Sequence, residues 1–184
     1  MPPSTPRIPP VSIEVYEALE RELGRQRRPG QPALNVTRTI AQHPALVKAR
    51  APLQRHLLHE STLPPREREL VILRTGWLWQ SEYEFGQHTR MSKEAGVTDT
   101  DVRRVTEGPD AAGWTPFETT LLRAVDELRA DAFISDPTWA LLSERYSVQQ
   151  MLDLVFLVGQ YTAVSMALRT FGVQLEEGMP GFPR

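Results

Sequence analysis

Residues 65–97 read PRERELVILRTGWLWQSEYEFGQHTRMSKEAGV, and this stretch carries the clearest structural pattern in the chain. Pro65 suits the first turn of a helix, and apolar residues then recur at helical spacing on one side. A second helix is predicted over residues 79–95. It ends at Gly96, where glycine favours a left-handed helix cap. The stretch therefore predicts two consecutive helices, with Gly76 as a candidate kink between them.

The same helical patterns recur along the rest of the chain, and most begin at Pro, Ser, Thr or Asp. Ser61 or Thr62 is expected to cap the helix that begins at Pro65. No strand alternation or hairpin signal is present. We therefore predict an all-α protein of about seven or eight helices, whose last helix is central because it is apolar nearly all round. The other predicted helices cover residues 11–23, 44–60, 98–108, 115–130, 136–146 and 148–177.

Length and composition indicate one globular domain. The 184 residues are 40% hydrophobic and 24% charged, which is ordinary for a chain that buries a core. Residues 1–10 contain five prolines, which fix the backbone and remove hydrogen-bond donors. We expect residues 1–10 to be a Pro-rich flexible arm and residues 11–184 to form a single helical domain. An Arg-, Gly- and Pro-rich link at residues 24–32 is expected to end the first helix.

Several classes of function are disfavoured by the composition. The net charge is −2, with 21 basic and 23 acidic residues interleaved, so a nucleic-acid partner is not expected. The chain has no cysteine and therefore no disulfide, thiolate metal site or thiol redox couple. The start lacks a signal-peptide core, and the longest apolar run, Met151 to Val158, is short and contains Asp153. We expect a cytoplasmic protein without a membrane partner.

One group of residues has the spacing that acid/base chemistry needs. Ser81, Glu84 and His88 project from one face of the predicted helix, because residues three and four apart are neighbours there. A carboxylate beside an imidazole orients the ring and raises its pKa. Glu69 can reach the same place if the chain folds back between residues 76 and 79. Such Glu–His pairs are also common on solvated helix faces, so spacing alone leaves a surface role open.

Other catalytic and binding motifs are missing from the sequence. The four histidines lack the spacing of the common zinc motifs, so no metal site is expected. There is no Gly-rich phosphate loop, no Gly-x-Ser-x-Gly elbow and no dinucleotide-binding fingerprint.

The order of these residues resembles a family signature. Glu69 is followed by eleven residues, then Ser81-x-x-Glu84-x-x-x-His88, and then Glu94-Ala95-Gly96-Val97. This order is similar to the signature of the carboxymuconolactone decarboxylase / alkylhydroperoxidase (AhpD)-like family. In the peroxidase branch of that family, a Glu is followed by Cys-x-x-Cys-x-x-x-His and a turn with a small residue and glycine.

The resemblance extends more loosely from about Asn35 to Gly178. The segment from Phe156 to Thr162, with the later Phe171-Gly172-Val173, looks like the last core helix of the family. The resemblance implies an AhpD-like helical bundle that assembles as a homo-oligomer, a trimer or a hexamer.

The two thiol positions of the signature hold Ser81 and Glu84, and this departure decides the branch. Peroxide reduction in this family needs a thiolate and a resolving thiol, so the chain is not a thiol peroxidase. The resemblance implies instead the non-redox decarboxylase branch. The expected activity is that of a cofactor-independent lyase or isomerase. Its expected substrate is a small carboxylated lactone or unsaturated carbonyl acid, with no metal and no organic cofactor.

Decarboxylation of such a substrate needs a group that stabilises an oxyanion and a group that returns a proton to carbon. We expect His88 to donate the proton or stabilise the oxyanion. Glu84 is expected to orient and charge His88, and Glu69 to be a second proton carrier. The expected substrate-binding residues are Ser81, Tyr83, Arg74 and Trp77.

Two other functions stay open at this stage. The loss of both cysteines is equally compatible with a catalytically inactive ligand-binding or assembly subunit of the same fold. A helical adaptor that binds protein partners would show an exposed apolar groove instead of a polar site around Glu84 and His88.

Overall fold

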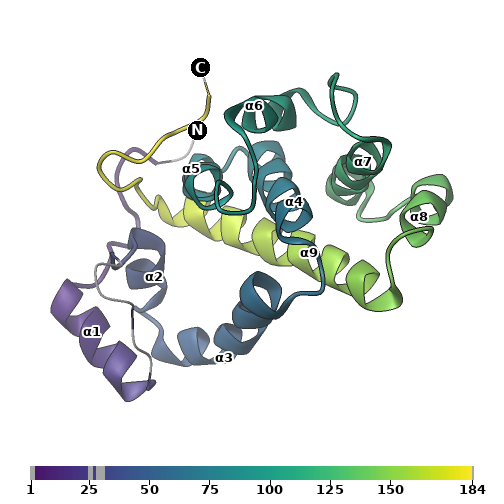
Figure 1. Cartoon of the computed structure of the whole chain (residues 1–184). Helices are drawn as coiled ribbons and strands as arrows, with labels where there is room; N and C mark the ends of the chain where they lie inside the picture. The colour runs from purple at the N-terminus through teal and green to yellow at the C-terminus, as the bar shows by residue number, and fades with distance from the viewer. Residues whose placement is uncertain (1–2, 25–26, 28–31, 184) are drawn as a thin grey trace.

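A computed structural model of the chain describes residues 3–24, 27 and 32–183, so residues 1–2 of the predicted arm and most of the 24–32 link lie outside it. The described residues form nine α-helices, one π-helical turn and no strand (Figure 1). The predicted all-α class is confirmed. The helices are α1 (Ile13–Glu22), α2 (Asn35–Ile40), α3 (Pro44–Arg55), α4 (Pro65–Leu78), α5 (Glu82–Met91), α6 (Asp99–Glu107), α7 (Pro116–Asp131), α8 (Asp136–Ser143) and α9 (Val148–Phe171), and the π-helical turn is η1 (His56–Glu60).

The core is built around α4 and α9. Figure 1 shows α9 running the length of the molecule, with α4 and α5 lying across it. Helix α4 packs against α9, α7, α5 and α6, and its residues 70–73 are completely buried. Two apolar clusters meet at α4, one shared with α7, α8 and α9 and the other with α5 and α6. Helix α4 therefore has its position fixed from several sides.

Among the described residues, α9 is the one helix long and apolar enough to cross a membrane. The apolar run from Met151 to Val158 lies within this helix, Val148–Phe171. The core helix of a globular protein has the same length and composition, and α9 buries one face against α4, α5, α7 and α8. Asp153 lies within α9, and its carboxylate accepts a hydrogen bond from the Thr62 backbone N–H.

Most predicted helix starts are confirmed by the caps. Thr98, Thr115 and Ser147 each form a reciprocal capping box with the residue three positions on. The ends differ more: α9 ends at Phe171, six residues early, because Gly172 adopts a left-handed conformation with φ 69°. Helix α4 runs through Gly76 without a break.

The prediction that Ser61 or Thr62 caps α4 is wrong. Pro64 is at the N-cap position, and no side chain caps this helix. The Thr62 amide and hydroxyl donate to Asp153 Oδ2 at 2.7 and 2.8 Å, and the Ser61 hydroxyl donates to the same oxygen at 3.2 Å. His56 Nε2 lies 2.7 Å from Asp153 Oδ1. A carboxylate in an apolar helix must find donors, and Asp153 finds them in the segment that joins α3 to α4.

The C-terminal tail crosses α5 and is held by one carboxylate. Glu176 accepts hydrogen bonds from the Tyr83 hydroxyl at 2.6 Å, the Gln87 amide at 2.6 Å and the Asn35 backbone N–H at 2.7 Å. Gly86 lets the tail lie close, because a Cβ there would be 2.1 Å from the Pro180 carbonyl oxygen. The tail therefore joins α2 to the outer face of α5.

Replacing Gly86 with alanine tests this close approach. We expect Gly86→Ala to lower the free energy of unfolding by about 1–3 kcal/mol, since an overpacked contact must displace the tail. Gly76→Ala is the matched control, because its Cβ meets its nearest atom at 3.4 Å and adds helix propensity. Urea denaturation measures both. Equal stability of the two variants would contradict the tail contact.

Candidate functional site

A tight turn between α4 and α5 brings the candidate residues together. The Ser81 N–H donates to the Gly76 carbonyl at 2.8 Å, and Gln80 adopts φ 52°, which is uncommon for a residue other than glycine. Helix α5 therefore begins at Glu82, three residues later than predicted. The chain reverses here, so α4 and α5 lie side by side and Glu69 reaches the face of α5.

His88 lies between two carboxylates. Its Nδ1 is 2.7 Å from Glu69 Oε2, and its Nε2 forms an ion pair with Glu84 Oε1 at 3.1 Å. The three residues are almost closed to solvent, with exposed fractions of 4% for His88, 3% for Glu69 and 6% for Glu84. Only the imidazolium form can donate to both carboxylates at once. The structure thus brings together all three residues predicted to be catalytic.

The electrostatics favour the charged forms of His88 and Glu69. Burial by itself lowers the pKa of His88, but the carboxylates of Glu69 and Glu84 outweigh it and raise this pKa to about 9. Burial raises the pKa of Glu69, yet His88 and Arg68 hold it below its ordinary value. At neutral pH the cluster therefore contains an imidazolium beside the ionised carboxylate of Glu69.

Two further residues complete the cluster, and the sequence reasoning missed both. Arg68 donates from Nε and Nη2 to Glu69 Oε1 at 3.3 and 3.2 Å. The Tyr161 ring from α9 meets the His88 ring edge-on, with centroids 5.1 Å apart. Burial and the charges of Glu84 and Glu69 raise the pKa of Tyr161, so its phenol stays protonated. No motif spacing pointed to Tyr161, which is distant in sequence from the other members.

Ser81 sits at the N-cap of α5, three residues before Glu84. Its hydroxyl is buried, and no group among the described residues hydrogen-bonds to it. Buried hydroxyls are nearly always paired in folded proteins. This hydroxyl therefore has its hydrogen-bonding capacity left for a ligand atom or a water molecule.

The structure does not bring the other predicted substrate-binding residues to the cluster. Arg74 forms a two-pronged ion pair with Asp126 at 2.6 and 2.7 Å and also donates to the Val105 carbonyl. It follows Glu69 by five residues, which places it about 140° around the helix. Trp77 packs against Phe85 and Phe182 in the apolar core, and Tyr83 binds the C-terminal tail through Glu176.

The part of the chain that the structure describes contains no group of three or more His, Asp or Glu side chains arranged to hold a metal ion. In the cluster, both His88 nitrogens and both Glu69 oxygens already have partners. The arrangement allows protons to be shared between the imidazole of His88 and the carboxylates of Glu69 and Glu84.

Comparison with known proteins identifies the class of this fold. The carboxymuconolactone decarboxylase family matches residues 44–127, which contain Glu69, Ser81, Glu84 and His88. No curated protein matches the sequence. This match and the fold described next support the resemblance of the chain to the carboxymuconolactone decarboxylase / AhpD-like family.

Three solved structures share the fold over most of the chain. An uncharacterized peroxidase-related protein from Silicibacter sp. is 15% identical, with a TM-score of 0.73 over 90% of this chain and 85% of that one. The alkylhydroperoxidase AhpD core protein from Ralstonia eutropha is 14% identical, with a TM-score of 0.73 over 92% and 93%. The debrominase Bmp8, solved as a cysteine-to-alanine variant with 2,3,4-tribromopyrrole, is 14% identical, with a TM-score of 0.70 over 92% and 91%.

The protonation of His88 is measurable by NMR. We expect its ring resonances to titrate with a midpoint near pH 9, well above the ordinary 6.5. Because this pKa is higher in the folded protein than in the unfolded chain, His88 stabilises the fold fully below pH 6.5. That contribution is lost as the pH rises through about 9.

The free energy of unfolding, measured against pH, tests the same point, and the His88→Gln variant is its control. His88→Gln should remove the decline in the free energy of unfolding between pH 6.5 and 9.5 that wild type shows. A His88 midpoint at or below 6.5, or the same decline in the variant, would contradict the sandwiched imidazolium.

Proposed function

We propose that the protein is a cofactor-independent lyase, a decarboxylase, or an isomerase, which acts by acid/base chemistry on a small carboxylated lactone or unsaturated carbonyl acid. The observation that carries the proposal is the buried imidazole of His88, held between Glu69 and Glu84 at 2.7 and 3.1 Å. Perturbed titratable groups of this kind are concentrated at catalytic sites. The match of residues 44–127 to the carboxymuconolactone decarboxylase family supports the same conclusion.

The geometry supports a different division of roles from the one expected from sequence. Both ring nitrogens of His88 face carboxylates, so His88 has no nitrogen left for the substrate in this arrangement. Glu84 uses Oε1 for His88, and no described group bonds its other oxygen. We assign Glu84 as the group that gives a proton to the substrate. His88 supplies that proton to Glu84, and Glu69 holds the imidazole and its charge.

The proposed decarboxylation balances as follows. The bond between the substrate carbon and its carboxylate breaks, carbon dioxide leaves, and the electron pair moves into the conjugated carbonyl. The proton on His88 Nε2 passes to the Glu84 carboxylate, and the enolate carbon then takes that proton from Glu84, which leaves Glu84 ionised and His88 neutral. A proton from solvent restores the imidazolium. In an isomerisation, Glu84 would instead take a proton from one carbon and return it to another.

Substrate recognition falls to groups beside the cluster. Arg68 replaces Arg74 as the proposed partner of the substrate carboxylate, because its guanidinium is next to Glu69 and Arg74 is bound to Asp126. The unpaired Ser81 hydroxyl is a hydrogen-bond donor for the developing oxyanion. That the debrominase of this fold was solved with a brominated pyrrole supports a small ring compound as the ligand.

A second candidate is a catalytically inactive subunit of the same fold. The observation that favours it is the closure of the cluster, whose side chains are 3–8% exposed. A catalytic role requires neighbouring side chains to part and admit the substrate. In an inactive subunit the same ion cluster would only hold α4 to α5.

Activity assays on variants separate these two functions. The assay uses a panel of carboxylated lactones and β-keto acids. We expect wild type either to release carbon dioxide from at least one of them or to exchange its carbon-bound protons for deuterium. Glu84→Gln should lower kcat by roughly 10²–10⁴-fold, the usual loss when a general acid is removed. His88→Gln should have a similar effect, because the relay then lacks its proton source.

Glu176→Gln is the matched control. It removes a carboxylate that binds Tyr83 and Gln87 of the same helix but lies outside the cluster, so kcat should stay near wild type. Turnover at the wild-type rate by both Glu84→Gln and His88→Gln would refute the assignment. Absence of turnover or exchange across the whole panel would favour the inactive subunit.

We also propose that the protein works in the cytoplasm as a homo-oligomer, a trimer or a hexamer, without nucleic-acid or membrane partners. Support comes from the outer face of α9, an apolar stripe formed by Val148, Leu152, Val155, Phe156 and Met166. Phe156 is 58% exposed. An apolar stripe of this length is usually covered by another protein surface, and a second copy of the chain is the occupant we propose.

Light scattering tests this assembly. Wild type should have a mass three or six times that of the 20.9 kDa chain, and Phe156→Glu should shift it toward the monomer by placing a charge in the buried stripe. Phe133→Glu is the control, since Phe133 is also an exposed aromatic residue but lies outside the stripe. A monomeric wild type would remove the proposal.

A further inference from the structure

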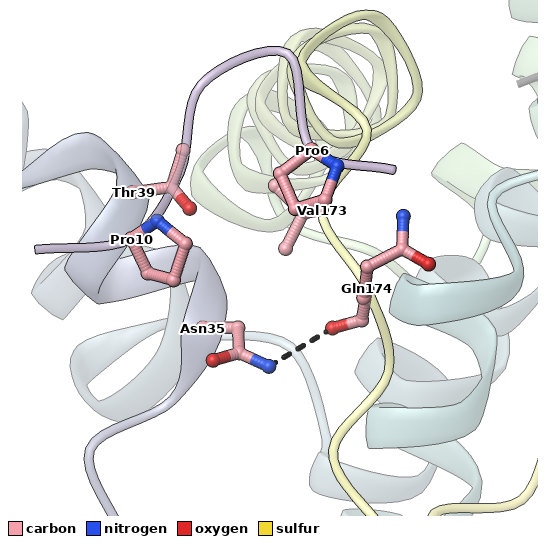
Figure 2. Close-up of a pocket in the computed structure, with 6 residues that line it drawn as sticks. All are labelled: Pro6, Pro10, Asn35, Thr39, Val173 and Gln174. Carbon is pink, nitrogen blue, oxygen red and sulfur yellow. Dashed lines mark hydrogen bonds between the residues drawn. The ribbon is translucent and has the colours of Figure 1, made fainter. Parts of the chain in front are cut away.

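A cavity lies where three parts of the chain that are distant in sequence meet. It has a volume of about 180 Å³. Figure 2 shows its walls: prolines of the N-terminal segment on one side, α2 on another, and the tail that follows α9 on the third. Its lining residues are Pro6, Pro10, Asn35, Thr39, Val173 and Gln174.

The walls of the cavity are held by main-chain hydrogen bonds. The Arg7 N–H donates to the Phe171 carbonyl at 2.8 Å, and the Val11 N–H donates to the Arg38 carbonyl at 3.2 Å. The Arg38 guanidinium returns a bond to the Val11 carbonyl at 2.8 Å. The N-terminal segment is thus tied at both ends of the cavity. A site formed in advance loses less entropy when a ligand binds.

The lining is neutral and mostly apolar, and it includes a buried hydroxyl without a hydrogen-bond partner among the described groups. None of the six lining side chains is ionisable. The two side-chain amides already donate, Asn35 to the Gln174 carbonyl at 3.1 Å and Gln174 to the Gly172 carbonyl at 2.7 Å. The Thr39 hydroxyl has no hydrogen-bond partner among the described groups, and Thr39 is only 3% exposed. Figure 2 shows this hydroxyl turned toward the space between Pro10 and Pro6.

We infer that this cavity is a binding site for a small, neutral, largely apolar ring compound with one hydrogen-bonding group, which pairs with the Thr39 hydroxyl. The size fits such a ligand, because an engineered apolar cavity of about 150 Å³ binds benzene. Ligand sites in proteins commonly combine an apolar lining with very few polar groups that fix orientation. A charged ligand would find no counter-charge on the lining residues.

The inference is independent of the proposed activity. None of the lining residues belongs to the cluster of Glu69, Glu84 and His88. Occupancy would instead join the N-terminal segment, α2 and the tail, and the same tail continues to α5 through Glu176.

The test uses three probes of similar size on the full chain: phenol, toluene and benzoate. Calorimetry measures affinity, and backbone amide NMR shifts locate the site. We expect phenol to bind at one site and to shift the amides of Asn35, Thr39, Val173 and Gln174. Toluene should bind more weakly than phenol, and benzoate at least tenfold more weakly.

Two variants assign the binding to this cavity. Thr39→Val keeps the shape and removes the hydroxyl, so it should weaken phenol roughly tenfold while toluene is unchanged. Val173→Phe fills the cavity and should abolish the binding of both, with thermal unfolding confirming that each variant is folded. The inference is overturned if phenol does not bind, if its shifts centre on Glu84 and His88, or if the folded Val173→Phe variant binds phenol like wild type.

Discussion

The packing of α4 between α5, α7 and α9 is the constraint on which the rest of this structure depends. Four successive side chains, residues 70–73, are completely buried, so α4 contacts the core on every side in that turn. Burying each such side chain stabilises the fold by about 1.5–3 kcal/mol. The same turn carries Glu69 at its start, and the position of that carboxylate is therefore set by apolar packing.

This packing explains how a buried charged cluster can exist at all. Buried ion pairs contribute little net stability, because desolvation of the charges offsets their attraction. The surrounding apolar core supplies the stability, and the cluster is satisfied internally: Glu69 binds His88 and Arg68, and His88 also binds Glu84. The arrangement keeps an imidazolium and two carboxylates dry and close together. Such an environment, from which bulk water is excluded, suits the transfer of a proton to carbon.

Much of the fold and the centre of the site could be predicted from the sequence. The predicted helix starts near residues 98, 115 and 148 were correct, because the capping boxes that Thr98, Thr115 and Ser147 form there need only the residues within one turn. The meeting of Glu84 and His88 follows from helical spacing, and the arrival of Glu69 needed only one chain reversal. These predictions depend on short-range geometry.

The parts that were missed depend on long-range contacts. Helix α2 has six residues, four of them β-branched, and no side-chain cap, and the tail holds its first residue through two hydrogen bonds to Asn35. The Asp153 carboxylate takes Thr62 away from capping α4. Arg68 and Tyr161 reach the cluster from a neighbouring position on α4 and from α9, and neither has a spacing that marks it. Each of these features depends on contacts with residues that are distant in sequence or that no motif marks.

The central claim is that His88 is an imidazolium shared by two ionised carboxylates, and a neutron diffraction structure at pH 7 tests it most directly. The account predicts deuterium on both Nδ1 and Nε2 of His88 and none on Glu69 or Glu84. A ring with deuterium on only one nitrogen, beside a protonated Glu84 or Glu69, would contradict it.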